Sequence, residues 1–220
     1  LLSLGLKVPH PAHVKPEQFN RLLQQVKDRP DSVSIAMTML RSLTHAEYTP
    51  ENIGHFGLSL DAYAHFTSPI RRYPDLLVHR AIRHILRGGK PGKYAYKSGD
   101  MERLGVITSA HERRAEEATR DVEAWLKCEY MENKVGEEFA GVISGVTNFG
   151  VFVQISELLI DGLVHVTSLS NDYYHFDSGA LQLVGERSGK KYRLGDPMRV
   201  KVQRVDMETR RIDFAPAGEQ

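Results

Sequence analysis

Two adjacent arginines lie within the segment HFTSPIRRYPD, residues 65–75, behind a Thr-Ser-Pro and ahead of a Tyr-Pro-Asp. A guanidinium presents a planar fork of N–H donors that can hold a phosphate through two hydrogen bonds, and it stays charged at any physiological pH. Pro69 fixes its own φ, and the Thr-Ser pair before it can cap a following turn. We therefore expect Arg71 and Arg72 near backbone N–H groups that also favour anions.

Other interpretations of this segment stay open. The arginines can form a surface pair that bridges Asp61 or Asp75, and Pro74 leaves the boundary ambiguous because it can itself begin the helix. The local charge favours an anion. Residues 71–97 carry only one acidic side chain, that of Asp75, against a set of basic residues that would attract phosphates: Arg71, Arg72, Arg80, Arg83, Arg87, Lys90, Lys93 and Lys97.

A second candidate surface lies in the segment FGVFVQI, residues 149–155, where apolar side chains alternate with others. Alternation along a strand places every second residue from Val151 inside, which leaves Phe152 outside. A kink at the glycine between the two phenylalanines would let Phe149 reach the same face. Two exposed rings near His165 would form a platform for unpaired bases, each contributing about 1–3 kcal/mol. Alternatively, the phenylalanines pack under the long loop that follows.

Composition limits the class of protein. The chain has 220 residues, 41% of them hydrophobic and 26% charged, which fits one large or two modest globular domains. No apolar run approaches the ~18 residues of a membrane span. The single cysteine, Cys128, lies in a helical pattern and is expected in a core, and one thiol points to a reducing compartment, hence the cytoplasm. The start, LLSLGLKVPHP, resembles neither an initiator segment nor a signal peptide, so we expect a fragment.

Periodicity divides the chain into a helical and an all-β part. The pattern predicts four helices: one that begins at Pro16 and ends before Arg29-Pro30, one capped by Asp31 with an apolar face of Ile35, Met39, Leu40 and Leu43, one with an apolar stripe from Leu77 to Leu86, and one over roughly residues 100–132. Short alternating strands with glycine-containing turns then predict a small antiparallel barrel. We expect an α+β, multi-domain chain: residues 1–134 mostly helical, residues 135–216 a barrel and residues 217–220 a tail.

The β part resembles the S1 RNA-binding domain, a barrel of the OB-fold class. The segments GVISGVTNFGVFVQI, DGLVHVTSLS and GDPMRVKVQRVD…RRIDF match that pattern. The resemblance implies that Phe149, Phe152 and His165 face RNA, with Arg211 near a polar contact position. The insertion NDYYHFDSGALQLVGERSGKKY is long for such a loop, and its basic residues either extend RNA contact or form a solvated tip. A net charge of −3 over residues 135–220 argues against strong binding by electrostatics alone.

The stretch HFGLSLDAYAHFTSPIRRYPDLLVHRAI resembles the last segment of the catalytic domain in the ribonuclease II (RNB) family, and EEATRDVEAWLKCEYM with the adjoining S1 pattern is similar to its bacterial ribonuclease R branch. The resemblance implies a processive, Mg²⁺-dependent exoribonuclease that hydrolyses RNA from the 3′ end to nucleoside 5′-monophosphates. It implies that Arg71 contacts the phosphate near the scissile bond. Arg72 and the basic helix face would guide the strand.

The resemblance also implies what this chain lacks. The family holds Mg²⁺ with closely spaced aspartates, whereas Asp61, Asp75, Asp100 and Asp121 stand far apart in this sequence, so no metal site is expected here. The expected partners are single-stranded RNA, structured RNA with a 3′ overhang, and ribosome-associated or trans-translation factors, with no membrane. The parent is expected to be monomeric, and surface left by the missing part can drive self-association.

Two hypotheses follow, and they are compatible. The parent protein is a 3′-to-5′ exoribonuclease, and this chain supplies the phosphate-contacting arginine and the S1 surface. Taken alone, the chain is a single-stranded RNA-binding module without catalytic activity. A translation factor without nuclease ancestry leaves the HFTSPIRRYPD segment unexplained, and a helical adaptor leaves Phe149, Phe152 and Arg71 unexplained together.

Overall fold

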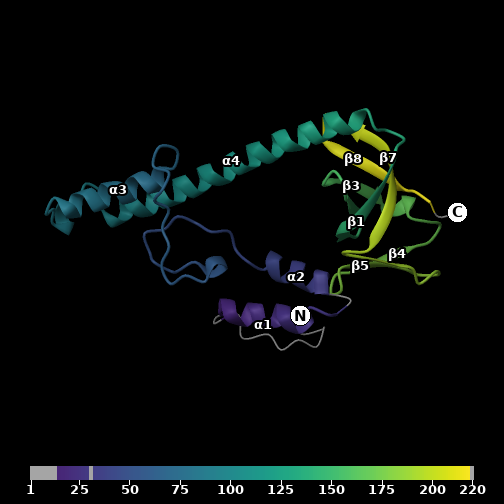
Figure 1. Cartoon of the computed structure of the whole chain (residues 1–220), viewed down its shortest axis with the longest axis horizontal. Coiled ribbons are helices and arrows are strands. Elements are labelled where there is room, and N and C mark those ends of the chain that lie inside the picture. Colours follow the sequence, from purple (N-terminus) through teal and green to yellow (C-terminus); the bar gives the residue numbers. More distant parts are fainter. Residues whose placement is uncertain (1–13, 30–31, 219–220) are drawn as a thin grey trace. The chain divides into compact units, whose positions relative to one another are not determined.

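The computed structural model describes residues 14–29 and 32–218, except the side chain of residue 34 (Figure 1). The chain forms two compact units. The first unit combines the N-terminal helices with the part of the chain from residue 120 onward, and the second unit covers residues 44–119. The predicted domain boundaries at residues 134 and 216 stay predictions.

The first unit opens with helices α1 (Pro16–Val26) and α2 (Ser32–Arg41). Pro16 lies in the first turn of α1, where its missing N–H leaves no helical hydrogen bond unmade. The two helices bury a small cluster of Leu22, Val26, Ile35 and Met39. Leu40 was also predicted on this face but is 61% exposed, since it lies about 100° around the helix from Met39. The predicted cap Asp31 lies outside the described residues.

The second unit contains helix α3 (Tyr73–Leu86), the start of the long helix α4 (Ser98–Glu132) and two 3₁₀ turns, η3 (Phe56–Leu58) and η4 (Pro91–Lys93). Pro74 lies in the first turn of α3, so the proline does begin this helix. The helix ends just before Gly88, which has a φ of +73° that favours glycine. The predicted apolar stripe is buried at Leu77, whereas Leu86 is 81% exposed.

Five strands close the predicted barrel in the order β1-β2-β3-β8-β7. They are β1 (Glu138–Thr147), β2 (Gly150–Ile155), β3 (Ile160–His165), β7 (Pro197–Asp206) and β8 (Arg211–Pro216). All pairings are antiparallel except the parallel pair of β3 with β8. The strand alternation predicted from the sequence is confirmed, because the inward residues are buried: Val151, Val153, Ile155, Val200 and Val202.

The segment after β3 differs from the expected loop. Following the 3₁₀ turn η5 (Val166–Ser168), it forms a three-stranded antiparallel sheet of β4 (Tyr174–Asp177), β5 (Gln182–Gly185) and β6 (Lys191–Arg193). This inserted sheet buries Tyr174, Leu183 and Tyr192 in the same core cluster as the barrel. The insertion is therefore a folded part of this domain and not a solvated tip.

Cys128, near the end of α4, is 1% exposed and belongs to the barrel's core cluster, as the sequence predicted. Burial raises the pKa of its thiol, and the nearby carboxylate of Asp206 adds to the shift. Val122 and Trp125, on the same helix, lie outside the core, since they are 58% and 43% exposed. No helix within the described ranges is both long enough and apolar enough to span a bilayer.

Candidate nucleic-acid interface

The two arginines lie in a tight turn immediately before α3. The backbone N–H groups of Arg71 and Arg72 both donate to the carbonyl of Ser68, at 3.2 and 3.0 Å. The N–H of Ser68 in turn donates to Oδ2 of Asp75 at 2.8 Å, across the turn. A carboxylate in the first turn of a helix is also favoured by the helix dipole. The turn is thus closed by hydrogen bonds on both sides of the arginine pair.

Asp75 also accepts a hydrogen bond from one of the two arginines. The guanidinium of Arg72 donates to Oδ2 of Asp75 at 3.0 Å, and the Asp75 side chain has no exposed surface. Burial disfavours the charged form of Asp75, but the N–H of Ser68 and the guanidinium of Arg72 outweigh it and hold the pKa of this carboxyl below its ordinary value. The expected alternative of an Arg–Asp pair is therefore confirmed for Arg72.

Arg71 has a different environment. Its side chain is exposed, and none of the described residues forms an ion pair or hydrogen bond with its guanidinium. Its backbone is fixed by the bond to Ser68, while its five N–H donors face solvent. Arg71 is consequently the member of the pair that can bind an external anion without breaking an internal contact.

A second network fixes the chain that leads into this turn. The hydroxyl of Tyr48 lies 2.8 Å from Nδ1 of His65 and donates to Oε1 of Glu112 at 3.1 Å. Burial, together with the carboxylate of Glu112, raises the pKa of Tyr48 to about 12. The Tyr48 N–H donates to the buried Ser109 hydroxyl at 2.9 Å, and a side chain at Gly105 would collide with the Tyr48 carbonyl. Helix α4 thereby holds the segment before the turn in place.

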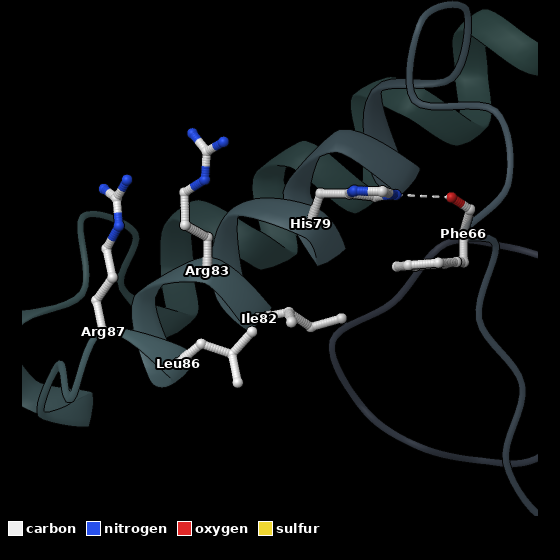
Figure 2. Close-up of a pocket in the computed structure, with 6 residues that line it drawn as sticks. All are labelled: Phe66, His79, Ile82, Arg83, Leu86 and Arg87. Atoms are coloured by element: carbon white, nitrogen blue, oxygen red, sulfur yellow. Dashed lines mark hydrogen bonds between the residues drawn. The ribbon is translucent and has the colours of Figure 1, made fainter.

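The basic face of α3 borders an open cavity of about 320 Å³ (Figure 2). The rings of Phe66 and His79 stack at 4.2 Å on one side, and Nε2 of His79 lies 2.9 Å from the Phe66 carbonyl. Figure 2 shows Arg83 and Arg87 extending in the same direction from the helix. These two cations therefore extend to one side of α3, away from the apolar side chains of Ile82 and Leu86.

The guanidinium of Arg80, another predicted member of the basic face, contacts aromatic residues. It donates to the hydroxyls of Tyr73 at 3.2 Å and Tyr96 at 2.6 Å, and lies 5.7 Å from the centre of the Tyr73 ring. These contacts link the loop after α3 to the first turn of the helix. The structure thus separates cations whose guanidinium groups donate to neighbouring side chains, such as Arg72 and Arg80, from Arg71, whose guanidinium has no such contact among the described residues.

The barrel carries the predicted aromatic pair on its outer surface. Phe149 is 44% exposed and Phe152 is half-buried, with their rings edge-to-face at a centroid distance of 6.2 Å. Phe152 pairs with Gly145 on β1 and with Leu163 on β3. A side chain at Gly150 would collide with the carbonyl of Val164, so the start of β2 requires a glycine at this close approach. The exposure of Phe149 argues against packing under the insertion.

His165 is the neighbour of this pair, because it lies directly opposite Gly150 in the β2–β3 ladder. The imidazole is exposed, and its Nδ1 lies 2.7 Å from the hydroxyl of Thr167 and accepts from the Thr167 N–H. Phe149, Phe152 and His165 therefore meet at one end of the outer face of β2 and β3. The imidazole's orientation is fixed by its own turn, which leaves the ring face free for a base.

Arg211 lies apart from this cluster. The parallel pairing of β3 with β8 places Asp213 beside Leu163, so two residues earlier Arg211 falls beside Asp161. Asp161 lies opposite Gln154, two pairs beyond Phe152 and away from His165. Arg211 is the first residue of β8 and is exposed. From there its side chain can contact the sugar-phosphate backbone of a nucleic acid that crosses the barrel face.

Comparison with known proteins assigns both parts of the chain. A model of the RNB domain matches residues 4–88, and a model of the S1 RNA binding domain matches residues 132–215. Ribonuclease R of Escherichia coli (strain K12) is 52% identical over 98% of this chain, and ribonuclease R of Vibrio cholerae is 50% identical over 96%. The chain is homologous to the C-terminal part of ribonuclease R. It spans 27% of the length of each of these curated relatives.

Solved structures of ribonuclease R have the same fold. The apo form of Mycoplasma genitalium RNase R matches with a TM-score of 0.83 at 27% identity, over 95% of this chain and 33% of that one. The same enzyme in complex with ribose methylated single-stranded RNA matches with a TM-score of 0.82 at 26% identity, over the same shares. The predicted α+β architecture with an S1 barrel is therefore confirmed.

The ribonuclease R matches place the candidate residues in both domains. The RNB match contains the turn of Arg71 and Arg72, and the S1 match contains Phe149, Phe152 and His165 together with Arg211. The structure brings the first two together in one turn and the next three together on one face. The individual roles of these six residues stay predictions.

The described residues do not fit a Mg²⁺ site by themselves. They contain no group of three or more His, Cys, Asp or Glu side chains that could hold a metal ion. Asp75 is buried against Arg72, Asp100 accepts from the backbone of Lys97 at 3.1 Å, and Asp121 pairs with Arg210 at 2.8 Å.

Two supporting features were not found from the sequence. The Tyr48–His65–Glu112 network joins residues that are 17 and 64 positions from Tyr48, and periodicity carries no information on such pairs. The bond from Ser68 to Asp75 spans seven residues, and here a signal exists. The signal is an Asp in the first turn of a helix that directly follows a Ser-Pro turn. A carboxylate at this position can accept a hydrogen bond from the backbone of the turn.

Proposed function

We propose that this chain is the C-terminal part of a processive 3′-to-5′ exoribonuclease that hydrolyses RNA to nucleoside 5′-monophosphates. The observation that carries the proposal is the identity of 52% to a ribonuclease R over 98% of this chain. Within the parent enzyme, this chain supplies the S1 surface that binds the substrate strand and one arginine at the scissile phosphate.

Arg71 is the residue that we assign to the phosphate. Hydrolysis of a phosphodiester increases the negative charge on the non-bridging oxygens, and a fixed guanidinium stabilises that charge more in the transition state than in the ground state. The exposed guanidinium of Arg71, set on a backbone closed by Ser68, supports this role. Arg72 completes the turn through Asp75, and we assign its partly exposed side chain to guiding the RNA strand.

The S1 barrel binds single-stranded RNA by stacking. Unpaired bases expose their faces, and aromatic rings on an outer barrel face accept them with little sequence preference. Phe149, Phe152 and His165 supply such faces, and Arg211 supplies a cation for the backbone farther along. Because residues 135–220 carry a net charge of −3, stacking contributes more to this binding than electrostatic attraction does.

The parent enzyme depends on Mg²⁺ held by residues outside this chain, which supplies Lewis-acid chemistry when bound. It acts in the cytoplasm on single-stranded RNA and on structured RNA with a 3′ overhang, and it associates with ribosome-linked factors of trans-translation. The parent is a monomer. The isolated chain self-associates through exposed apolar side chains such as Ile85 and Leu86, which are 68% and 81% exposed.

An alternative function is favoured by the metal observation. Since the described residues do not form a Mg²⁺ site, the isolated chain acts as a single-stranded RNA-binding module and does not cleave. The proposed activity is tested by following the complete parent protein on RNA labelled at its 5′ end. Processive digestion from the 3′ end converts this substrate directly into a short labelled product without intermediates. Accumulation of labelled mononucleotide at the first time point would mean digestion from the 5′ end and would contradict the proposal.

A further inference from the structure

The inserted sheet of β4, β5 and β6 presents a second exposed face that the barrel surface does not use. One face of the sheet is covered, since Tyr174, Leu183 and Tyr192 are buried in the core. Because side chains alternate across a strand, the pairing of the three strands places the others outside in two rows. One row contains His175, Val184 and Lys191, and the next contains Asp177, Gln182 and Arg193.

An aromatic pair stands at the edge of this outer face. Tyr173 is 65% exposed, and its ring lies edge-to-face with the imidazole of His175 at a centroid distance of 4.9 Å. The side chain of His175 is 64% exposed. An exposed ring of this size adds little to folding, since most of its apolar surface stays in water. The two rings together offer a platform of the kind that stacks a nucleobase.

The platform is held by the carboxylate of Asp172. Its two oxygens accept from the N–H groups of Tyr173, Arg187 and Ser188 and from the Ser188 hydroxyl, at 2.6–3.1 Å. These hydrogen bonds lower the pKa of Asp172 to about 2, the Ser188 hydroxyl contributing most. The Tyr173 carbonyl accepts from Glu186 at 2.8 Å. The start of β4 and the turn at 186–188 are thereby joined, which fixes Tyr173 beside Arg187.

Basic residues lie in the turn beside Tyr173 and on the outer face of the inserted sheet. Arg187 and Lys191 are exposed, and Arg193 is partly exposed in the row next to Lys191. Two carboxylates share the face: Glu186 lies 3.7 Å from Nε2 of His175, and Asp177 closes its own turn by accepting from two backbone N–H groups. Residues 171–193 carry a net charge of +1, against −3 for residues 135–220 as a whole. The insertion is therefore the part of this domain that suits a polyanion.

We propose that Tyr173 and His175, flanked by Arg187 and Lys191, form a second binding surface for single-stranded RNA on the S1 domain. A base stacks on the Tyr173–His175 platform, and the two cations contact the adjacent phosphates. This surface lies on other β-strands than the Phe149–Phe152 face. A single-stranded RNA that is longer than the site on the barrel therefore engages both surfaces. The inference rests on the proposed RNA-binding function, which the barrel face tests separately.

The test measures binding of a fluorescent oligouridine to the whole 220-residue chain by anisotropy at fixed salt. One barrel covers about 4–16 nucleotides, so an oligonucleotide of about 24 residues extends beyond it. We expect Tyr173→Ala to weaken binding of this oligonucleotide about fivefold or more, because it removes the ring on which one base stacks. Tyr173→Phe keeps the ring and should bind like the wild type, and Lys191→Glu should weaken binding without any change of the platform.

Tyr130→Ala provides the matched control, since Tyr130 is also about half-exposed, at 50%, but lies on α4 away from these strands. It should leave binding unchanged. Normal binding by both Tyr173→Ala and Lys191→Glu would overturn the inference. If Phe152→Ala still weakens binding in that case, the proposed function stands and only the second surface fails. Absence of binding by the wild-type chain would overturn both.

Discussion

The guanidinium of Arg72 lies 3.0 Å from Oδ2 of Asp75, a carboxylate with no exposed surface, while the adjacent Arg71 faces solvent. The same Oδ2 accepts the N–H of Ser68 at 2.8 Å. One buried carboxylate therefore closes the turn and holds one arginine of the pair. The guanidinium of the other arginine stays exposed. Two identical neighbouring side chains thus have different environments, and we expect a different result from the removal of each.

Arg71→Ala in the complete enzyme should slow cleavage by about 10²–10³-fold, the usual effect of removing one donor at a developing oxyanion. RNA binding should change far less, since one phosphate contact among many is lost. Single-turnover rates and Kd values measured on the same RNA separate the two effects. Arg103→Ala, an exposed arginine on α4, is the control and should leave the rate unchanged. Equal losses in rate and binding would rule out the assigned role.

Asp75→Asn should destabilise the turn by about 2 kcal/mol or more, because it removes the buried negative charge that pairs with the partly exposed Arg72. Since the folded pKa of Asp75 is lowered, its contribution to stability is fully present above the unfolded pKa of about 4. It is lost as the pH falls through the folded value. Chemical unfolding at neutral pH measures the change, with Asp61→Asn at an exposed position as control. Identical unfolding midpoints for both variants would contradict the structural role of the Arg72–Asp75 pair.

Phe152→Ala should weaken binding to single-stranded RNA by about 1–3 kcal/mol and leave the barrel folded. Phe152 is half-buried on the outer face, whereas Val153, the next residue, is fully buried. Val153→Ala should therefore show the reverse, a lower melting temperature with RNA binding intact below it. Thermal melting and anisotropy on both variants make the comparison. A melting temperature for Phe152→Ala as low as that for Val153→Ala would mean that the ring is core.

The edge of the inserted sheet should open in acid before the barrel does. The pKa of Asp172 is lowered to about 2, so its stabilising hydrogen bonds are present above the ordinary value of 3.8 and lost as the pH falls toward 2. Hydrogen exchange of the Arg187 and Ser188 amides should accelerate over this interval. Asp172→Asn should show fast exchange at neutral pH. Slow exchange of these amides in that variant would show that Asp172 does not hold the turn.

Much of this architecture could be predicted from the sequence because it depends on local patterns. The long helix predicted over roughly residues 100–132 is α4, Ser98–Glu132, and the alternation around Val151 identified the inward face of β2. In each case the residues that determine the structure are neighbours in the chain. The exposure of Phe149, at 44%, was one of two alternatives that the sequence left open, and the S1 resemblance favoured it.

The remainder depends on contacts between distant residues. The inserted sheet has strands of three or four residues, too short for alternation to separate them from a loop, and Tyr174 and Tyr192 become core residues only when the strands pair. The difference in side-chain contacts between Arg71 and Arg72 could not be predicted either. Both have the same side chain, and only the position of Asp75 after the turn decides which one is held.

The most direct test of the central claim uses this chain alone with end-labelled single-stranded RNA, with and without Mg²⁺, followed on a binding gel and a sequencing gel. We predict a retarded complex and intact RNA under both conditions, because the proposed RNA-binding surface lies in this chain, whereas the residues that the structure describes form no metal-binding group. This would be contradicted by a Mg²⁺-dependent ladder that shortens from the 3′ end and that remains after contaminating nuclease has been excluded. It would mean that carboxylates assigned here to structural roles, such as Asp75 and Asp100, hold the metal.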